Sequence, residues 1–348
     1  MASEPKTVKF SLGMLIAIVA LLACVGAIGG YIGSHINKTA RIEVSPSSQN
    51  SSGTMIPVSQ QVTVSPGKLA SDVVASKSKS IFLLVHKTAK GVKVFATGVA
   101  VTNDGIIAST QNGGTDPVFA LGEDATLIEA TQIGTDVLTG IHFFKLQNAL
   151  INPIDVNQTT PKIGSTFLVL SRSSVTTSPL IQETIMSQIH PASADTPEGI
   201  QQIGGIQMIT NAVPGSAILD EDGKLAGLLL TDDGSSVVLA SDVAQAISRL
   251  SSNTLSYNPF TDLGFTISWS LQEDAQSHLG IKAVVQSVAP KSIASQGELK
   301  TGDIITAVNT STVSWDSNIT NLLTGNQIQL TVLRNGISTS ITLAKQAS

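Results

Sequence analysis

The 348-residue sequence predicts a mainly β protein, with two successive β units followed by a smaller C-terminal α+β domain. Two observations predict this class. Short runs rich in Val, Ile and Thr recur along the chain, and turn signals such as Asn103-Asp104-Gly105 separate them. The hydrophobic content of 42% is sufficient for real cores, and because aromatic residues make up only 4%, aliphatic side chains must fill them.

Composition excludes several classes of function. Charged residues are 13% of the chain and the net charge is −5, so no basic surface favours nucleic acid. The single cysteine, Cys24, excludes a disulfide within the chain and a cysteine-rich metal site. Neither a phosphate-binding glycine loop nor clustered metal-ligand spacing is present, so we expect no cofactor and no metal from the sequence.

The N-terminus carries an apolar segment. Residues 1–9 form a short polar segment, and residues 10–32 contain no charged side chain. About 20 apolar residues span a bilayer, and this run is longer than the core of a cleavable signal peptide. We therefore expect a single-pass helix in the cell membrane. The flanking positive charges nearly balance, but long domains translocate largely regardless of charge, which predicts a cytoplasmic N-terminus and an extracytoplasmic body.

A lipoprotein is the alternative interpretation of this segment. The sequence Leu21-Leu22-Ala23-Cys24 is similar to a lipoprotein cleavage site with Cys24 as the lipidated residue. The apolar run continues to Ile32, which argues against it. Residues 33–68 are rich in Ser, Gln, Asn, Thr and Pro, and they predict a flexible tether whose ends lie about 35 Å apart.

Residues 69–250 predict two units of six strands each and then a helix. The first unit has strands at 80–87, 92–102, 105–110, 117–121, 125–133 and 141–146. The second has strands at 166–171, 181–189, 206–212, 217–219, 225–231 and 237–240. The helix covers Ser241–Leu250, with Ser241 as its N-cap and Val243, Ile247 and Leu250 on one face.

Residues 260–346 form a third domain with the most specific motifs of the chain. The triplet Leu263-Gly264-Phe265 opens it, and the run LKTGDIITAVN follows at 299–309. Two alternating segments around Asn335-Gly336 close it as a hairpin. These motifs resemble those of a PDZ domain.

The stretch Gln207–Gly227 extends the resemblance to the whole chain. Its sequence predicts a strand, a Pro214-Gly215 turn, a short strand, an Asp222-Gly223 hairpin turn and a third strand. Together with the two six-strand units, the helix and the PDZ-like motifs, this stretch makes the chain similar to the HtrA (Deg) family of serine proteases. The resemblance implies a trypsin-like double β-barrel at 69–250 and one PDZ domain.

The family's catalytic motifs are degenerate in this sequence. Asn112 stands where a TNxHV pattern has its histidine, and Gly140 stands where a TDLAVLK pattern has its aspartate. In place of PGNSGGP the chain has residues 213–219, VPGSAIL, in which the nucleophile position falls on Pro214, or on Ser216 if gaps are opened. An amide cannot act as a general base, so the resemblance implies a pseudoprotease with no catalytic residues. The alternative is an active endopeptidase of envelope protein quality control, rearranged around Ser216.

The PDZ resemblance implies a peptide site. The backbone N–H groups of Leu263, Gly264 and Phe265 are expected to bind a terminal carboxylate. A helix at Trp315–Leu323, capped by Ser314, is expected to present Ile319 and Leu322 or Leu323 to the ligand. The implied partners are C-terminal or unfolded segments of other proteins. The family resemblance also implies a homotrimer or an assembly with an active relative.

Overall fold

The structure, a computed structural model, describes residues 66–345 except 173–179, 192–199, 201, 208, 232–233 and 274–278. The expected membrane segment at 10–32, Cys24 and most of the expected tether lie outside these residues. Within the described part of the chain, no helix is long and apolar enough to cross a membrane.

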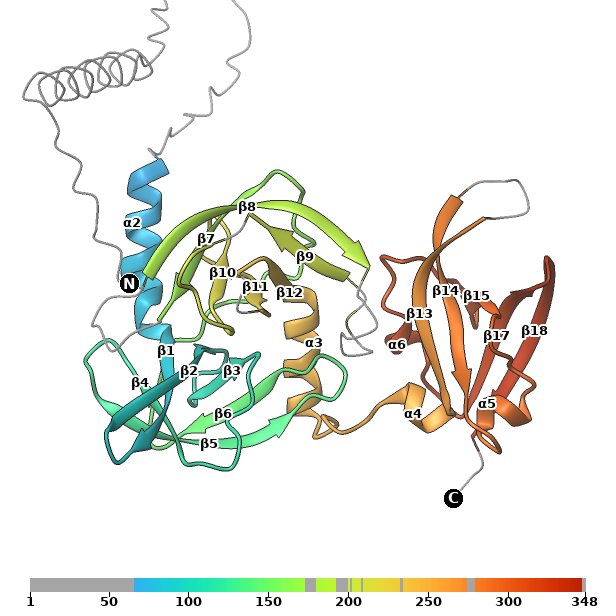
Figure 1. The fold of residues 1–348 in the computed structure, drawn as a ribbon, viewed down its shortest axis with the longest axis horizontal. Coiled ribbons are helices and arrows are strands. Elements are labelled where there is room, and N and C mark those ends of the chain that lie inside the picture. Colours follow the sequence, from blue (N-terminus) through green and yellow to red (C-terminus); the bar gives the residue numbers. More distant parts are fainter. Residues whose placement is uncertain are drawn as a thin grey trace, which may run out of the picture. The chain divides into compact units, whose positions relative to one another are not determined.

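The first barrel is a closed sheet of six antiparallel strands, in the order β1-β2-β3-β6-β5-β4 (Figure 1). All six expected strands are present within a few residues of their predicted bounds. They are β1 Ile81–Thr88, β2 Gly91–Ala100, β3 Ile106–Ser109, β4 Val118–Leu121, β5 Leu127–Thr135 and β6 His142–Leu146. Ten buried apolar side chains, among them Leu84, Ile107 and Phe144, form a core of this barrel.

The second barrel repeats this architecture, in the order β10-β11-β12-β9-β8-β7. Its strands are β7 Thr166–Ser171, β8 Leu180–Pro191, β9 Gln202–Ile206, β10 Ala217–Leu219, β11 Leu225–Leu229 and β12 Ser236–Leu239. The expected strand at 206–212 is wrong, because β9 ends where that strand was expected to begin. Asn211 has a φ of 59°, which a strand does not accommodate.

β9 was missed because it contains Gly204 and Gly205, which weaken a strand pattern. The structure shows why they are there. A Cβ on Gly205 would lie 2.5 Å from Cγ of Gln188 on the neighbouring β8, and a Cβ on Gly204 would lie 3.0 Å from Leu239 of β12. Both glycines therefore permit close packing within the barrel.

Two helices accompany the barrels. α2 covers Pro66–Lys77, although the tether was expected to run to Lys68 and a β unit to begin at Leu69. Val73 and Val74 of α2 pack against apolar side chains of the barrels, and such tertiary contact stabilises a helix whose own periodicity is weak. α3 covers Ala240–Ser251, with Leu239 rather than Ser241 at its N-cap.

One apolar cluster joins the barrels. It includes Ile141 and Phe143 from the first barrel and Leu168 and Leu228 from the second. Val243 and Ala246 of α3 belong to the same cluster. The two barrels and the helices thus bury a common core, and this packing fixes the two sides of any cleft between the barrels.

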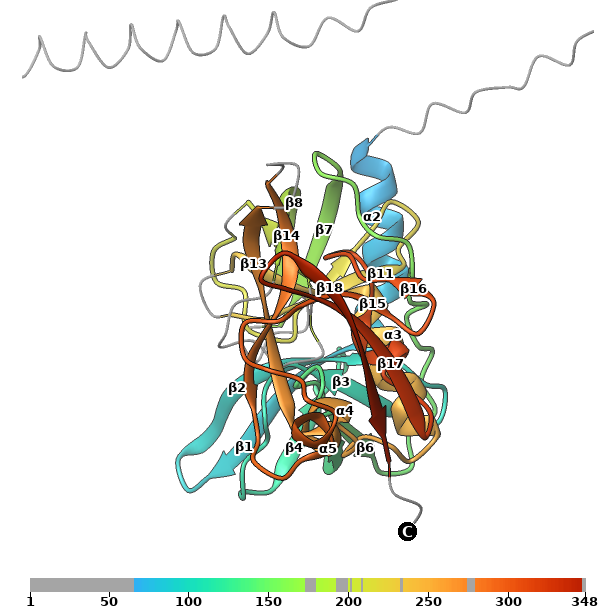
Figure 2. The ribbon, with the colours of Figure 1, turned by 90° about the vertical axis from the view of Figure 1, so that its right-hand side faces the viewer.

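The C-terminal domain is a sheet in the order β13-β14-β15-β17-β18, with β16 paired to β15 (Figure 2). Its strands are β13 Phe265–Glu273, β14 Leu279–Val288, β15 Ile304–Val308, β16 Ser311–Thr312, β17 Gln327–Arg334 and β18 Ile337–Ala344. Its short helices are α4 Pro259–Leu263, α5 Ile293–Gln296 and α6 Ile319–Leu322. The expected closing hairpin is confirmed, with Asn335 and Gly336 both at positive φ.

The helix expected at Trp315–Leu323 is shorter in the structure. It begins after Asn318, whose side chain accepts a hydrogen bond from the Asn321 N–H, so Asn318 and not Ser314 is the N-cap. Ser314 instead bonds to Ser317, both through its backbone N–H and through its hydroxyl, in a turn before the helix.

Candidate functional site

The serine considered as a nucleophile, Ser216, is sealed inside the turn that carries it. Its side chain is 0% exposed, and its hydroxyl donates to the carbonyl oxygen of Val213 at 2.5 Å. Its backbone N–H donates to the same carbonyl at 3.2 Å. A nucleophile needs an accessible oxygen hydrogen-bonded to a base, and Ser216 has the bonding of a turn residue.

The turn also lacks free backbone donors for an oxyanion. Pro214 has no N–H, and the Gly215 N–H donates to the Leu229 carbonyl at 2.8 Å. An oxyanion hole needs donors aimed at the reacting oxygen, so the bonded and missing N–H groups of 214–216 cannot supply one in this conformation.

Gly215 packs this turn against the first barrel. The Thr97 N–H donates to the Pro214 carbonyl at 2.9 Å, across the junction of the two barrels. Gly215 has a φ of 81°, and a Cβ there would lie 2.6 Å from Oγ of Ser109 and closer still to the Thr97 carbonyl oxygen. First-barrel atoms thus occupy the space beside the turn.

Asn112 lies on an exposed loop after β3. Its Oδ1 accepts a hydrogen bond from the Gly114 N–H at 2.8 Å, which is a local turn contact. The next residue, Gly113, is fixed by a hydrogen bond from its N–H to Oε1 of Gln132 on β5 at 3.2 Å. These two hydrogen bonds order the loop, and neither of them involves a histidine side chain.

Gly140 has no side chain, so it contributes only backbone groups at the position expected for the aspartate. It has a φ of 67°, and its N–H donates to the carbonyl of Asp136 at 2.8 Å. The Asp136 carboxylate is nearby but already bonded: it accepts from the N–H and hydroxyl of Thr139 and from two nitrogens of Arg249 on α3. This carboxylate therefore anchors α3 to the first barrel.

One histidine lies within hydrogen-bond distance of a hydroxyl. His142 Nδ1 is 2.9 Å from Oγ1 of Thr135 and 3.4 Å from Nε2 of Gln132. Gln132 Nε2 also donates to the Thr135 hydroxyl at 3.1 Å, so the arrangement suits a neutral ring whose Nδ1 accepts. Burial lowers the pKa of His142, which favours the same neutral form.

This cluster was not singled out in the sequence analysis. Gln132, Thr135 and His142 meet because Thr135 and His142 pair across β5 and β6. The sequence holds no motif for that pairing. Because Gln132 also fixes Gly113, the cluster supports the loop that carries Asn112. The other described histidines are elsewhere: His86 stacks on Phe95, and His190 Nδ1 lies 2.9 Å from the Pro191 carbonyl.

The residues expected to bind a peptide lie together in the C-terminal domain. Leu263 ends α4, Gly264 follows with a φ of 77°, and Phe265 begins β13. Leu263, Phe265 and Ile319 are buried in one apolar cluster, against which Leu322 packs. The Gly264 N–H donates to the Phe260 carbonyl at 2.8 Å, so the middle donor of the expected carboxylate nest is already bonded here.

The sheet edge beside these residues is open. Among the described strands, β13 pairs with β14 alone, through nine residue pairs from Phe265 to Glu273. An unpaired edge presents a row of backbone donors and acceptors, which is the surface that strand addition uses.

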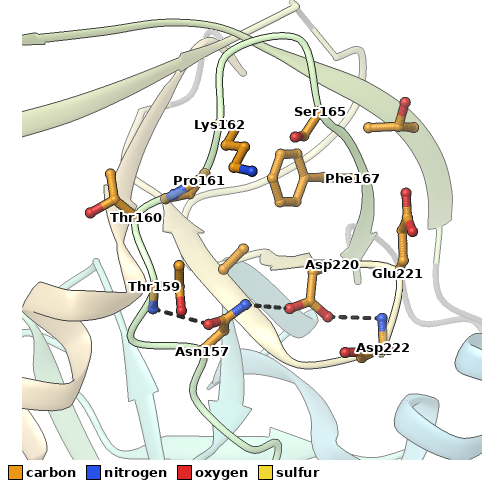
Figure 3. A pocket seen from close by; sticks show the side chains of 12 residues that line it. Asn157, Thr159, Thr160, Pro161, Lys162, Ser165, Phe167, Asp220, Glu221 and Asp222 are labelled. Atoms are coloured by element: carbon orange, nitrogen blue, oxygen red, sulfur yellow. Dashed lines mark hydrogen bonds between the residues drawn. The ribbon is translucent and has the colours of Figure 1, made fainter.

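A separate pocket of about 330 Å³ lies at one end of the second barrel (Figure 3). Its walls are the 157–167 segment and the turn after β10, and Phe167 and Lys162 point into it. Asp220 closes one side by accepting from Asn157 Nδ2 at 2.6 Å and from the Asp222 N–H at 3.0 Å. None of Asn112, Gly140 and Ser216 lines this pocket.

Comparison with solved structures establishes the class of fold, a trypsin-like pair of six-stranded barrels. The HtrA-type protease AlgW with a tripeptide matches with a TM-score of 0.60 and 15% identity, over 79% of this chain and 96% of that one. The serine endoprotease from Yersinia pestis matches with a TM-score of 0.53 and 18% identity, over 80% and 98%. The fold is therefore that of HtrA-type proteases. No protein-family model and no curated protein matches this sequence.

Proposed function

We propose that the chain is a membrane-anchored, HtrA-like pseudoprotease that binds peptides outside the cytoplasm through a PDZ domain, as a sensor or scaffold. The first half of this proposal, the absence of catalysis, rests on the hydrogen bonding of Ser216. Its hydroxyl is buried and bonded to the Val213 carbonyl, while Asn112 and Gly140 supply neither base nor carboxylate. Losing members of the triad typically costs about 10⁴–10⁶ in turnover.

The open edge of β13 supports the second half of the proposal, which is peptide binding. An extended peptide would add to β13 as a further strand, with α6 and Leu322 on its other side. Two of the solved structures with this fold are HtrA-type proteases described with a tripeptide and a decapeptide. Because the Gly264 N–H is bonded to Phe260, capture of a terminal carboxylate requires this bond to open.

An active endopeptidase centred on Ser216 is the alternative. This alternative requires the Ser216 hydroxyl to break its hydrogen bond to the Val213 carbonyl and to form one with a general base. The histidine that does contact a hydroxyl, His142, is bonded to Thr135 and Gln132. The geometry therefore favours the binding function.

Peptide titration of the full-length protein tests the proposal. We expect fluorescently labelled peptides ending in a free apolar residue to bind saturably, and their amidated forms to bind more weakly. Leu322→Ala should weaken binding, whereas Ile337→Ala, at an exposed site on the opposite edge strand β18, should not. No binding to a broad peptide library, or equal loss in both variants, would contradict it.

A further inference from the structure

The far half of the β13–β14 hairpin extends beyond the rest of its sheet (Figure 1). Only Ala283 and Val284 of β14 pair with β15, and β13 pairs with β14 alone among the described strands. Residues 269–273 and 279–282 therefore form a ribbon of two strands. A two-stranded hairpin is marginally stable in water unless a further strand or a helix packs against it. A third strand would therefore stabilise this part of the domain.

One face of β13 is apolar along its length. Side chains alternate between the two faces of a strand, so this face carries Phe265, Ile267, Trp269 and Leu271. Phe265 is buried in the domain core, and Ile267 and Trp269 pack against that core while remaining partly exposed. Leu271 lies farther along the strand and is 61% exposed. The apolar face thus continues from the core into solvent.

β14 adds to the exposed part of this face. Ile281 pairs with Leu271 across the ribbon and is partly buried, and Leu279, on the same face of β14, is 68% exposed. Residues that pair directly across two strands share a face, so these side chains lie together. We call the set Trp269, Leu271, Leu279 and Ile281 the ribbon face. An exposed apolar patch of this kind is typical of an interaction site.

The other face of β13 is polar. Nε2 of Gln286 on β14 donates to Oγ of Ser268 at 2.6 Å, and Nε2 of Gln272 donates to Oγ of Ser270 at 3.0 Å. Residues 265–272 contain no proline and no charged side chain, although such residues commonly protect an edge strand from pairing. The backbone edge of β13 is therefore open to a further strand.

A polypeptide strand fits both features of the ribbon. Its backbone would pair with the unpaired N–H and C=O groups at the edge of β13, and its side chains would cover the ribbon face. A lipid surface or a small apolar ligand would cover the side chains but leave the row of backbone groups without hydrogen-bond partners. The structure therefore favours an extended protein segment as the occupant.

We propose that the ribbon face binds the upstream part of the peptide that adds to β13, and selects segments in which apolar and polar residues alternate. This inference rests on the proposed function, because it requires a peptide beside β13. A C-terminus near residues 263–265 makes the peptide antiparallel to β13, so residues farther from that terminus lie closer to Leu271. Every second one of them lies against the ribbon face, and the residues between lie on the side of Ser268 and Ser270.

Only a peptide long enough to reach the ribbon gains these contacts. Trp269 and Leu271 follow Phe265 by four and six positions, so a ligand must place apolar side chains about four and six residues before its C-terminus. Partial burial of such side chains strengthens binding by about fivefold. A shift of the apolar residues by one position moves them to the polar face and removes this gain.

Fluorescence of Trp269 in the full-length protein tests the ribbon face. The chain contains two tryptophans, so Trp315→Phe leaves Trp269 as the reporter. The probes are two peptides of equal length and composition that share the same free, apolar C-terminal residue. In the first, leucines stand opposite Trp269 and Leu271, and in the second each leucine is moved by one position. We expect the first to bind about fivefold more tightly and to shift Trp269 emission to shorter wavelength.

Leu271→Ser, made in the Trp315→Phe background, separates the ribbon face from the rest of the peptide site. We expect it to remove roughly half or more of the preference for the first peptide, because an apolar contact is lost. Ile337→Ser is the matched control and should keep the preference, since Ile337 is 69% exposed on the opposite edge strand β18. Both substitutions are at exposed sites, so both variants should keep the wild-type circular dichroism spectrum.

Two results would separate this inference from the proposed function. Saturable binding of both peptides with equal affinity would overturn the inference and leave peptide binding intact, whereas binding of neither peptide would overturn both. A peptide-free shift of Trp269 emission that Leu271→Ser abolishes would also overturn the inference. If phosphatidylcholine vesicles cause that shift, the occupant is a membrane, and if a higher protein concentration causes it, the occupant is a second copy of the chain.

Discussion

At the scale of single residues, Gly215 is the position at which a small change should be most damaging. It has a φ of 81°, and first-barrel atoms of Thr97 and Ser109 occupy the space of a Cβ. We expect Gly215→Ala to lower the free energy of unfolding by about 3 kcal/mol or more, from the sum of the left-handed conformation and the steric overlap.

Urea denaturation of the full-length protein measures this cost. Gly114→Ala is the matched control, because Gly114 has a φ of 67° but no atom lies within 4 Å of its Cβ position. That control should show the conformational cost alone, about 1 kcal/mol. Equal losses in the two variants would mean that the contact between turn and barrel is not tight.

The ion pair of Asp136 and Arg249 gives a second prediction for single residues. Asp136 is 0% exposed, and Asp136→Ala leaves the Arg249 guanidinium without its partner. Breaking a buried pair in this way typically costs about 3–5 kcal/mol. The measurement is again urea denaturation.

Asp104 provides the comparison for that experiment. It pairs with Lys145 at 2.7 Å, but both side chains are well exposed. Asp104→Ala should cost less than about 1 kcal/mol, as surface pairs do. A similar cost for the two aspartates would show that Asp136 does not anchor α3.

At the scale of elements, Asp303 fixes the start of β15 in the C-terminal domain. Its carboxylate accepts from Nε and Nη2 of Arg334 on β17, at 2.7 and 2.6 Å, and from the Lys300 N–H. Burial opposes ionisation of Asp303, but the hydrogen bonds from Arg334 and Lys300 outweigh it and hold its pKa below 3.8. The charged carboxylate therefore stabilises the folded domain.

The sign of the pH dependence follows from this lowered pKa. The stabilisation is fully present above the unfolded pKa of 3.8 and is lost as pH falls through the lower folded value. Asp303→Asn should therefore lower Tm at neutral pH, and the difference from the wild type should shrink once pH falls below 3.8, the ordinary pKa of an aspartate. A difference in Tm that stays constant with pH would contradict this account.

The order of elements could largely be predicted from the sequence, since alternation and turn chemistry mark eleven of the twelve barrel strands. The exception, β9, contains two glycines that the alternation rule penalises. α2 depends on packing of Val73 and Val74 against distant strands, which no local pattern reveals. α6 is shorter than expected because Ser314 and Ser317 bond to one another in a turn instead of capping a helix.

Some features of the candidate site could be proposed from the sequence and others could not. The replacement of histidine and aspartate by Asn112 and Gly140 could be proposed from the sequence as a prediction, because each position belongs to a local motif. The bonding of Ser216 to Val213 could not, since it depends on the conformation of one turn.

At the scale of the whole molecule, the protease fold does not depend on a catalytic triad. The barrels share one apolar cluster with α2 and α3, and the turn at Pro214-Gly215 is held by backbone bonds to Thr97 and Leu229. These contacts hold the two barrels together regardless of which residues occupy the expected catalytic positions. The proposed function, a binding domain attached to a non-catalytic body, requires only that this framework stays folded.

Labelling of the full-length protein with a fluorophosphonate probe, alongside casein digestion, tests this central claim most directly. We predict no labelling above that of Ser216→Ala and no digestion, because the Ser216 hydroxyl is buried and bonded to Val213. Ser216→Ala should also remain folded, losing one hydrogen bond worth about 1 kcal/mol. Labelling of the wild type that disappears in Ser216→Ala, accompanied by casein cleavage, would contradict the account.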